Sequence, residues 1–155
     1  MSKREIGVGL ISVGWMGKVH SKAYALLPSF YPELNVKTRL VIACDSAPDR
    51  AEYAQDVLGY EQFTLDYNEV LNHPDVDVVS ICAPNFLHAE MGIAAAKAGK
   101  AFWIEKPVGR GAHETEAVAA AAEQAGVLTT IGFNYRHALR PPGQLGCGQH
   151  SSFAS

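Results

Sequence analysis

The chain has 155 residues, of which 48% are hydrophobic, and its 13 basic and 16 acidic residues give a net charge of -3. This length suits one domain of ordinary size with a buried core. The net charge is weakly negative, whereas proteins that bind nucleic acid or anionic membranes usually have a basic surface. No stretch approaches the roughly 20 apolar residues of a membrane span. The N-terminal MSKRE leads into a strand rather than a secretory signal. We therefore predict a cytoplasmic protein with a small-molecule partner, and no nucleic-acid or membrane partner.

The three cysteines, Cys44, Cys82 and Cys147, have no C-x-x-C spacing. An odd number without that spacing argues against a disulfide framework or a zinc site, so no metal is predicted. Cys44 and Cys82 stand near the ends of apolar runs, where buried and unreactive thiols are expected.

The first motif is a strand, a glycine turn and a helix. Residues 6–11 are apolar and rich in β-branched side chains, and an amphipathic helix follows over residues 16–27. Unpaired N–H groups and the positive dipole end of such a helix stabilise a pyrophosphate. Residues 12–17 read SVGWMG, so the dinucleotide fingerprint G-x-G-x-x-G keeps Gly14 and Gly17 but has Ser12 at the tight turn. The alternative is an ordinary turn without a ligand.

The second predicted strand, residues 38–45, ends on an acid, Asp45. A carboxylate at this place in the dinucleotide fold accepts hydrogen bonds from the adenosine ribose and repels a 2'-phosphate, which favours NAD while leaving NADP possible. Asp45 lies further from Gly17 than the usual spacing of about 20 residues. We expect an irregular, Pro-broken insertion over residues 29–37 to account for the excess. The alternative role for Asp45 is a helix cap, which Ser46 could provide instead.

Short strands and helices alternate through the rest of the chain. Helices are predicted over residues 46–58, 67–72, 86–98 and 112–125, and strands over residues 62–64, 76–82, 101–104 and 127–133. Six strands alternating with helices predict an α/β fold, a doubly wound parallel (Rossmann) sheet with strand order 3-2-1-4-5-6. Open sheets of this kind bind ligands beyond the carboxyl ends of their strands. The segments at those ends are residues 12–17, 45, 83–85, 105–107 and 134–136.

With these positions in hand, the chain resembles the N-terminal domain of the Gfo/Idh/MocA oxidoreductase family from about residue 5 to residue 137. The resemblance is carried by Gly14-x-x-Gly17-x-x-His20, Asp45, Ala83-Pro84-Asn85-x-x-His88, Glu105-Lys106-Pro107 and Gly132-Phe133-Asn134-Tyr135-Arg136. Glu-Lys-Pro after a short strand is the most specific of these marks. Members of the family use NAD or NADP to oxidise or reduce a carbinol carbon, usually on a sugar, a cyclitol or a similar polyol.

The resemblance implies a cofactor site and a catalytic lysine. The implied cofactor-binding residues are Ser12, Val13, Gly14, Trp15, Met16, Gly17, Asp45, Arg50, Ala83, Pro84, Asn85, His88, Glu105, Lys106 and Arg136. Lys106 is implied to reach the substrate hydroxyl as well, and a cis bond is expected between Lys106 and Pro107. An ammonium beside a positively charged nicotinamide has its pKa lowered and can hydrogen-bond an oxygen that gains charge during hydride transfer. The alternatives are a solvated charge for Lys106, and packing or capping roles for His20 and His88.

The chain departs from the family pattern after residue 137. We predict a dinucleotide-binding domain over residues 1–137 and an irregular tail over residues 138–155, which is rich in Gly, Pro, Ser and Gln. The resemblance implies a second domain with most of the substrate pocket and a catalytic His, and we expect this chain to end before that domain. The tail is either a frameshifted reading of a longer gene or a flexible terminus. Full-length members are expected to form homo-oligomers.

Three functions follow from these observations. The first is the cofactor domain of a nicotinamide-dependent oxidoreductase, expected to bind cofactor weakly and to turn over no polyol in this form. The second is a stand-alone nucleotide-binding or regulatory module without catalytic activity. The third, a methyltransferase, is disfavoured by Lys106, because transfer of a methyl cation equivalent gains nothing from a nearby ammonium.

Overall fold

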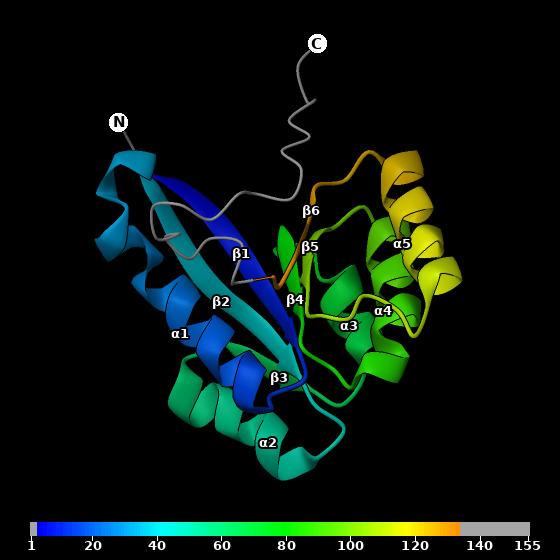
Figure 1. The fold of residues 1–155 in the computed structure, drawn as a ribbon. Coiled ribbons are helices and arrows are strands. Elements are labelled where there is room, and N and C mark those ends of the chain that lie inside the picture. The colour runs from blue at the N-terminus through cyan, green and yellow to red at the C-terminus, as the bar shows by residue number, and fades with distance from the viewer. Residues whose placement is uncertain (1–2, 134–155) are drawn as a thin grey trace, which may run out of the picture.

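A computed structural model describes residues 3–133 and contains one six-stranded parallel sheet. The strands lie in the order β3-β2-β1-β4-β5-β6, so the predicted doubly wound topology is confirmed (Figure 1). They are β1 (Arg4–Ile11), β2 (Val36–Cys44), β3 (Gln62–Thr64), β4 (Val78–Ile81), β5 (Ala101–Ile104) and β6 (Thr129–Ile131). The order reverses between β1 and β4, which is where open sheets of this type bind ligands.

Helices cover both faces of the sheet. They are α1 (Trp15–Phe30), α2 (Pro48–Tyr53), α3 (Tyr67–Asn72), α4 (Asn85–Lys97) and α5 (Ala112–Ala125), with a 3₁₀ turn η1 (Pro32–Leu34) and a π-helical turn η2 (Ala54–Leu58). In Figure 1, α1 and α2 lie on one side of the sheet and α3, α4 and α5 on the other. In the part of the chain that the structure describes, no helix is long and apolar enough to cross a membrane.

The core has one part on each face of the sheet. Val79 and Ile81 of β4, with Phe102 and Ile104 of β5, are almost fully buried in the cluster beneath α4 and α5. On the opposite face, Leu10 belongs to a smaller cluster beneath α1 and α2. A strand turns alternate side chains to opposite faces, so the residues between these apolar positions point toward α1. One of those residues, Ser80 of β4, is polar and fully buried.

The predicted irregular insertion at residues 29–37 is shorter than expected, because α1 and β2 occupy its two ends and only η1 (Pro32–Leu34) and its flanking residues lie between them. Helix α1 runs through Pro28 to Phe30, and β2 already begins at Val36. A proline inside a helix leaves the carbonyl four residues earlier without its N–H partner. Here that carbonyl, on Tyr24, accepts the Thr38 hydroxyl at 2.7 Å. A side chain from β2 thus replaces the missing hydrogen bond, which the local sequence pattern could not predict.

The other element predictions are correct in type, and those over residues 62–64, 67–72, 101–104 and 112–125 also have the observed bounds. Strand β4 is shorter than predicted at both ends, β6 likewise, and the predicted helix over residues 46–58 divides into α2 and η2. Helix α3 starts as expected, because Asp66 accepts the Asn68 N–H at 2.9 Å. Pairing therefore covers only the central part of the segments predicted for β4 and β6, and the flanking residues lie in loops.

Candidate functional site

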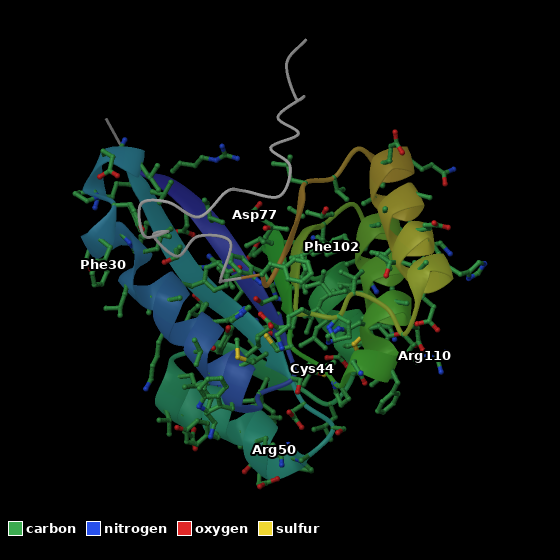
Figure 2. The ribbon with its side chains drawn as sticks, viewed as in Figure 1. Phe30, Cys44, Arg50, Asp77, Phe102 and Arg110 are labelled. Atoms are coloured by element: carbon green, nitrogen blue, oxygen red, sulfur yellow. The ribbon has the colours of Figure 1, made fainter. Side chains whose placement is uncertain are left out.

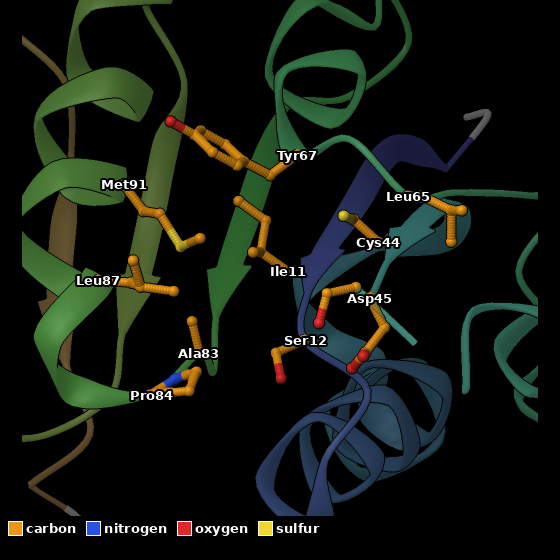
Figure 3. A pocket seen from close by; sticks show the side chains of 11 residues that line it. Ile11, Ser12, Cys44, Asp45, Leu65, Tyr67, Ala83, Pro84, Leu87 and Met91 are labelled. Carbon is orange, nitrogen blue, oxygen red and sulfur yellow. The ribbon is translucent and has the colours of Figure 1, made fainter. Parts of the chain in front are cut away.

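The carboxyl ends of β1, β2 and β4 surround a cavity of about 250 Å³. Its walls come from the turn after β1, the loop after β2, the start of α3 and the first turns of α4 (Figure 3). The lining residues are Ile11, Ser12, Cys44, Asp45, Ser46, Leu65, Tyr67, Ala83, Pro84, Leu87 and Met91. Three segments predicted from the sequence, at residues 12–17, 45 and 83–85, therefore meet at this cavity.

The turn after β1 is held in an uncommon backbone conformation at Ser12. Its φ is 77°, in the left-handed region that favours glycine, at the position where the fingerprint has its first glycine. The Ser12 N–H donates to the Cys44 carbonyl at 2.8 Å. At Gly17, a Cβ would lie 2.2 Å from the Ser12 carbonyl oxygen. The turn thus keeps the geometry of the fingerprint although its first residue carries a side chain.

Gly14 differs from Gly17 because it faces open space. A Cβ built on Gly14 would meet only the Ser12 Oγ, at 3.9 Å, and Gly14 is the N-cap of α1 without a side-chain cap. The first N–H groups of this 16-residue helix therefore point at a position that neither Gly14 nor a capping side chain fills. Trp15 is exposed beside it and Met16 is half-buried. An anion in front of α1 would meet N–H donors and the positive end of the helix dipole.

Asp45 joins the turn after β1 to the loop after β2. Its carboxylate accepts the Val13 N–H at 2.8 Å and the Ala47 N–H at 3.0 Å, and the residue is 5% exposed. The alternative role as a helix cap is not observed, because the N-cap of α2 is Ala47 and no side chain caps the helix. An ionised carboxylate has about four acceptor sites. Two of them serve the backbone, so capacity for two further hydrogen bonds remains.

The basic residues near this end of the site stand apart from Asp45. Arg50 is exposed on α2 (Figure 2), and the structure does not bring it to the cavity. The Lys18 ammonium lies 4.2 Å from the centre of the Tyr53 ring, in a cation–π contact. Arg136 lies outside the described residues, as do Tyr135 and the tail, so their predicted roles stay predictions.

Ala83, Pro84 and Asn85 form the junction between β4 and α4. Pro84 and Asn85 are exposed, whereas Ala83 is buried and lines the cavity. His88, one turn into α4, is 2% exposed, and its Nε2 lies 2.7 Å from the Ala83 carbonyl oxygen. Its Nδ1 lies 2.6 Å from the Pro107 carbonyl oxygen. The buried imidazole therefore connects the loop after β4 to the loop after β5.

Glu105, Lys106 and Pro107 follow β5, and the Lys106–Pro107 peptide bond is cis, as the family pattern implies. The two charged side chains have opposite environments. Glu105 is 8% exposed, and its Oε1 lies 3.0 Å from Nε2 of His20. Lys106 is exposed, and within residues 3–133 no carboxylate forms an ion pair with it. Lys106 is thus the cation free to meet a ligand at this end of the sheet.

Sequence reasoning missed the partners of His20. Ser80 Oγ lies 2.6 Å from the His20 Nδ1. Burial lowers the pKa of His20 below its ordinary value, an effect that Glu105 opposes in part. A signal existed, because Ser80 interrupts an apolar strand at a position whose side chain faces α1.

The two described cysteines agree with the prediction of unreactive thiols. Burial raises the pKa of Cys44 to about 12, although Cys44 lines the cavity. Burial also raises the pKa of Cys82 to about 12. Both thiols are therefore protonated near neutral pH, and the thiolate is the reactive form.

Comparison with known proteins gives one consistent result. The family model for the Gfo/Idh/MocA oxidoreductase family, NAD-binding Rossmann fold, matches residues 6–133. Levoglucosan dehydrogenase of Pseudarthrobacter phenanthrenivorans is 42% identical over 134 residues, which cover 86% of this chain and 34% of that protein. Inositol 2-dehydrogenase of Rhizobium meliloti is 34% identical over 128 residues, covering 83% of this chain and 36% of that protein.

Solved structures show the same relationship. A levoglucosan dehydrogenase in complex with NADH and levoglucosan aligns with a TM-score of 0.82 at 38% sequence identity, covering 86% of this chain and 36% of that one. The chain therefore spans about a third of the length of the relatives that it matches. The chain belongs to the Gfo/Idh/MocA oxidoreductase family, and the matched residues form its NAD-binding Rossmann fold.

Proposed function

We propose that this chain binds NAD along the carboxyl ends of β1, β2, β4 and β5, and that it supplies the cofactor side of a sugar or cyclitol dehydrogenase. One observation carries the proposal. In a member of an NAD-binding family, an open helix N-terminus at Gly14, the Asp45 carboxylate and the free Lys106 ammonium stand at one edge of the sheet. When bound, NAD supplies the hydride acceptor for oxidation of a carbinol.

The N-terminus of α1 fits the pyrophosphate. The space before Gly14 is free of side chains other than Ser12 Oγ, so phosphate oxygens could reach the backbone N–H groups of the first turn. The neighbouring cavity has mostly apolar walls, with Leu65, Tyr67 and Leu87 among them. A flat aromatic base is stabilised by such walls, so we assign the adenine to this cavity.

Asp45 fits an adenosine ribose with free hydroxyl groups. Its carboxylate retains acceptor capacity after binding two backbone N–H groups, and it would repel a 2'-phosphate. Lys18 lies over Tyr53 and Arg50 is exposed on α2, so neither neutralises Asp45. We therefore assign a preference for NAD over NADP.

The nicotinamide end is assigned to the loops after β4 and β5. Pro84 and Asn85 offer exposed surface there, and Glu105 offers a carboxylate oxygen to the second ribose. The buried His88 side chain supports this surface from the interior of the protein, because its ring nitrogens lie against the Ala83 and Pro107 carbonyls. We assign it the role of fixing these loops rather than touching the ring.

Lys106 is assigned to the substrate oxygen. Oxidation of a carbinol releases the hydroxyl proton as well as the C–H hydride, and the resemblance implies that a catalytic His of the family's second domain takes the proton. The Lys106 ammonium would hydrogen-bond the same oxygen and stabilise the negative charge that the oxygen carries once the proton has left. The names of two relatives, levoglucosan dehydrogenase and inositol 2-dehydrogenase, suggest a ring carbinol flanked by further hydroxyls as the substrate class. Association into homo-oligomers and a cytoplasmic location remain predictions, and the use of NAD is compatible with both.

Calorimetric titration of the 155-residue chain tests the cofactor assignment. We expect NADH to bind at a single site, with S-adenosylmethionine giving no heat. The Gly14→Val variant should lose NADH binding and keep its melting temperature, because its side chain enters the space assigned to the phosphates. Equal affinity of the variant and the parent chain for NADH would contradict the assignment.

A chimera tests the reaction. Residues 5–133 of this chain would replace the matching segment of the Pseudarthrobacter levoglucosan dehydrogenase, and NADH formation would be measured with levoglucosan, inositols and sugars. Loss of a positioned hydrogen bond to developing charge lowers turnover by about 10²–10³, so Lys106→Ala should do so while NADH affinity changes little. Undiminished turnover of the Lys106→Ala chimera would remove Lys106 from the mechanism.

A further inference from the structure

A buried chain of polar side chains crosses the α1 face of the sheet and ends at Glu105. His20 on α1 lies 3.0 Å from the Glu105 Oε1 through Nε2, and 2.6 Å from the Ser80 Oγ through Nδ1. His20 is 8% exposed and Ser80 is fully buried. Helix α1, strand β4 and the loop after β5 thus contribute to one continuous arrangement.

The hydrogen bonds of this chain all run in one direction. An ionised Glu105 only accepts, so the His20 Nε2 carries the hydrogen and donates to it. The Nδ1 of a neutral imidazole is then an acceptor, and it takes the Ser80 hydroxyl hydrogen. The tautomer of His20 is thereby fixed by its two neighbours, with the Cys82 thiol as a further contact at 3.6 Å from Nδ1.

Packing fixes the orientation of the imidazole and of the carboxylate. The Trp103 ring meets the His20 ring edge to face, with centroids 5.3 Å apart and planes at 74°. On the other side of Glu105, the backbone of Gly132 lies so near that a Cβ there would be 2.3 Å from Oε1. The carboxylate is thus held between His20 and Gly132, with Oε1 engaged by His20.

Apolar side chains of similar volume often stabilise a fold as well as a buried polar arrangement does. The benefit of this arrangement is therefore best sought in the geometry that it imposes on Glu105. We infer that His20 is a positioning residue for the cofactor: it fixes Glu105 so that the second oxygen of the carboxylate accepts a hydroxyl of the nicotinamide ribose. The inference rests on the proposed binding of NAD and extends it to a residue that touches no part of the cofactor.

The test compares two ligands that differ at this end. NADH and ADP share the adenosine and two phosphates, but ADP lacks the second ribose. We expect His20→Phe to weaken NADH binding about tenfold, the effect of losing one well-made hydrogen bond to a charged group, and to leave ADP binding within about twofold. His20→Gln, whose amide N–H still reaches toward Glu105, should restore part of the NADH affinity.

Controls separate positioning from stability. Ser80→Ala removes the hydroxyl that lies 2.6 Å from the His20 Nδ1 and should weaken NADH binding measurably, whereas Tyr60→Phe removes a buried hydroxyl on the same face, bonded to Ser21 at 3.3 Å, and should not. If His20→Phe does not fold, the His20→Gln and Ser80→Ala comparisons decide the matter. Equal losses of NADH and ADP affinity, or no loss of either, would overturn the inference. Failure of the parent chain to bind NADH would instead overturn the proposed function.

Discussion

The Asp45 carboxylate accepts the Val13 N–H at 2.8 Å, so an acid at the end of β2 fixes the turn that follows β1. The same carboxylate holds the Ala47 N–H at 3.0 Å, at the start of α2. One buried side chain therefore organises two loops that face the cavity. Substitutions at Asp45 should change both the stability of these loops and the choice of cofactor, and the two effects can be measured separately.

Asp45→Asn is expected to reduce the preference for NAD. The amide keeps one oxygen for the backbone but loses the charge that repels a 2'-phosphate, so the ratio of NADP to NAD affinity should rise about tenfold, or about 1.4 kcal/mol. Calorimetry with both cofactors measures the ratio. Melting temperatures serve as the control for folding. Tighter binding of NADP than of NAD by the parent chain would contradict this role of Asp45 and would indicate that Lys18 or Arg50 binds the 2'-phosphate.

Gly14 and Gly17 should respond oppositely to the same substitution. Gly14→Ala should keep the melting temperature and weaken NADH binding, since its Cβ enters open space. Gly17→Ala should destabilise the fold, because its Cβ would lie 2.2 Å from the Ser12 carbonyl oxygen.

Gly111→Ala is the matched control for Gly14→Ala. Gly111 is the N-cap of α5, and a Cβ there also meets nothing within 4 Å. This variant should bind NADH like the parent chain. A loss of NADH affinity with Gly111→Ala as large as that with Gly14→Ala would assign the effect to helix capping and not to the ligand.

Ser12→Gly should stabilise the protein and preserve or improve NADH binding. A left-handed conformation costs a residue with a Cβ about 1–2 kcal/mol, and the substitution by glycine removes this cost. The greater conformational freedom of glycine in the unfolded chain offsets about 0.5–1 kcal/mol of that stabilisation. We expect a rise of a few degrees in melting temperature. Asn35→Gly is the control. Asn35 also has a positive φ, 51°, but it does not line the cavity, so this variant should not change the affinity for NADH. A lower melting temperature for Ser12→Gly would contradict the strain assigned to this turn.

His88→Phe should destabilise the fold by about 1–3 kcal/mol, because a neutral imidazole carries one N–H and its loss leaves one of the two carbonyls, on Ala83 or Pro107, without a donor. Chemical denaturation measures the loss. His113→Phe, on the exposed surface of α5, should change the unfolding free energy little. Similar unfolding free energies for the two variants would show that the imidazole does not connect the loops.

The pH dependence of the unfolding free energy should reveal the protonation of His20. Because burial lowers the pKa of His20 below 6.5, the unfolded chain takes up the proton more readily than the folded chain. The contribution of the neutral ring is therefore complete above pH 6.5 and is lost as the pH falls from there toward the lower folded-state pKa. The advantage of the parent chain over His20→Gln in unfolding free energy should shrink across this range. An advantage that grows on acidification would mean that attraction to Glu105 outweighs burial.

The sequence predicted the topology because each strand and helix is specified locally, by apolar runs and by end signals such as Asp66 and Gly59. It located the ligand edge for the same reason, since the polar motifs directly follow the strands. The continuation of α1 through Pro28 depended on Thr38, a residue of the next strand. The contacts of His20 depended on Ser80 and Glu105, which only the sheet order places beside α1. Contacts between distant segments are what a local pattern cannot contain.

A crystal structure of the chain soaked with NADH tests the central claim most directly. The account predicts the pyrophosphate before the N-terminus of α1, the adenosine ribose on Asp45, and the nicotinamide ribose on the Glu105 oxygen that His20 leaves free. Lys106 should stand at the reactive face of the nicotinamide. NADH bound at another edge of the sheet, or with its phosphates away from Gly14, would contradict the account.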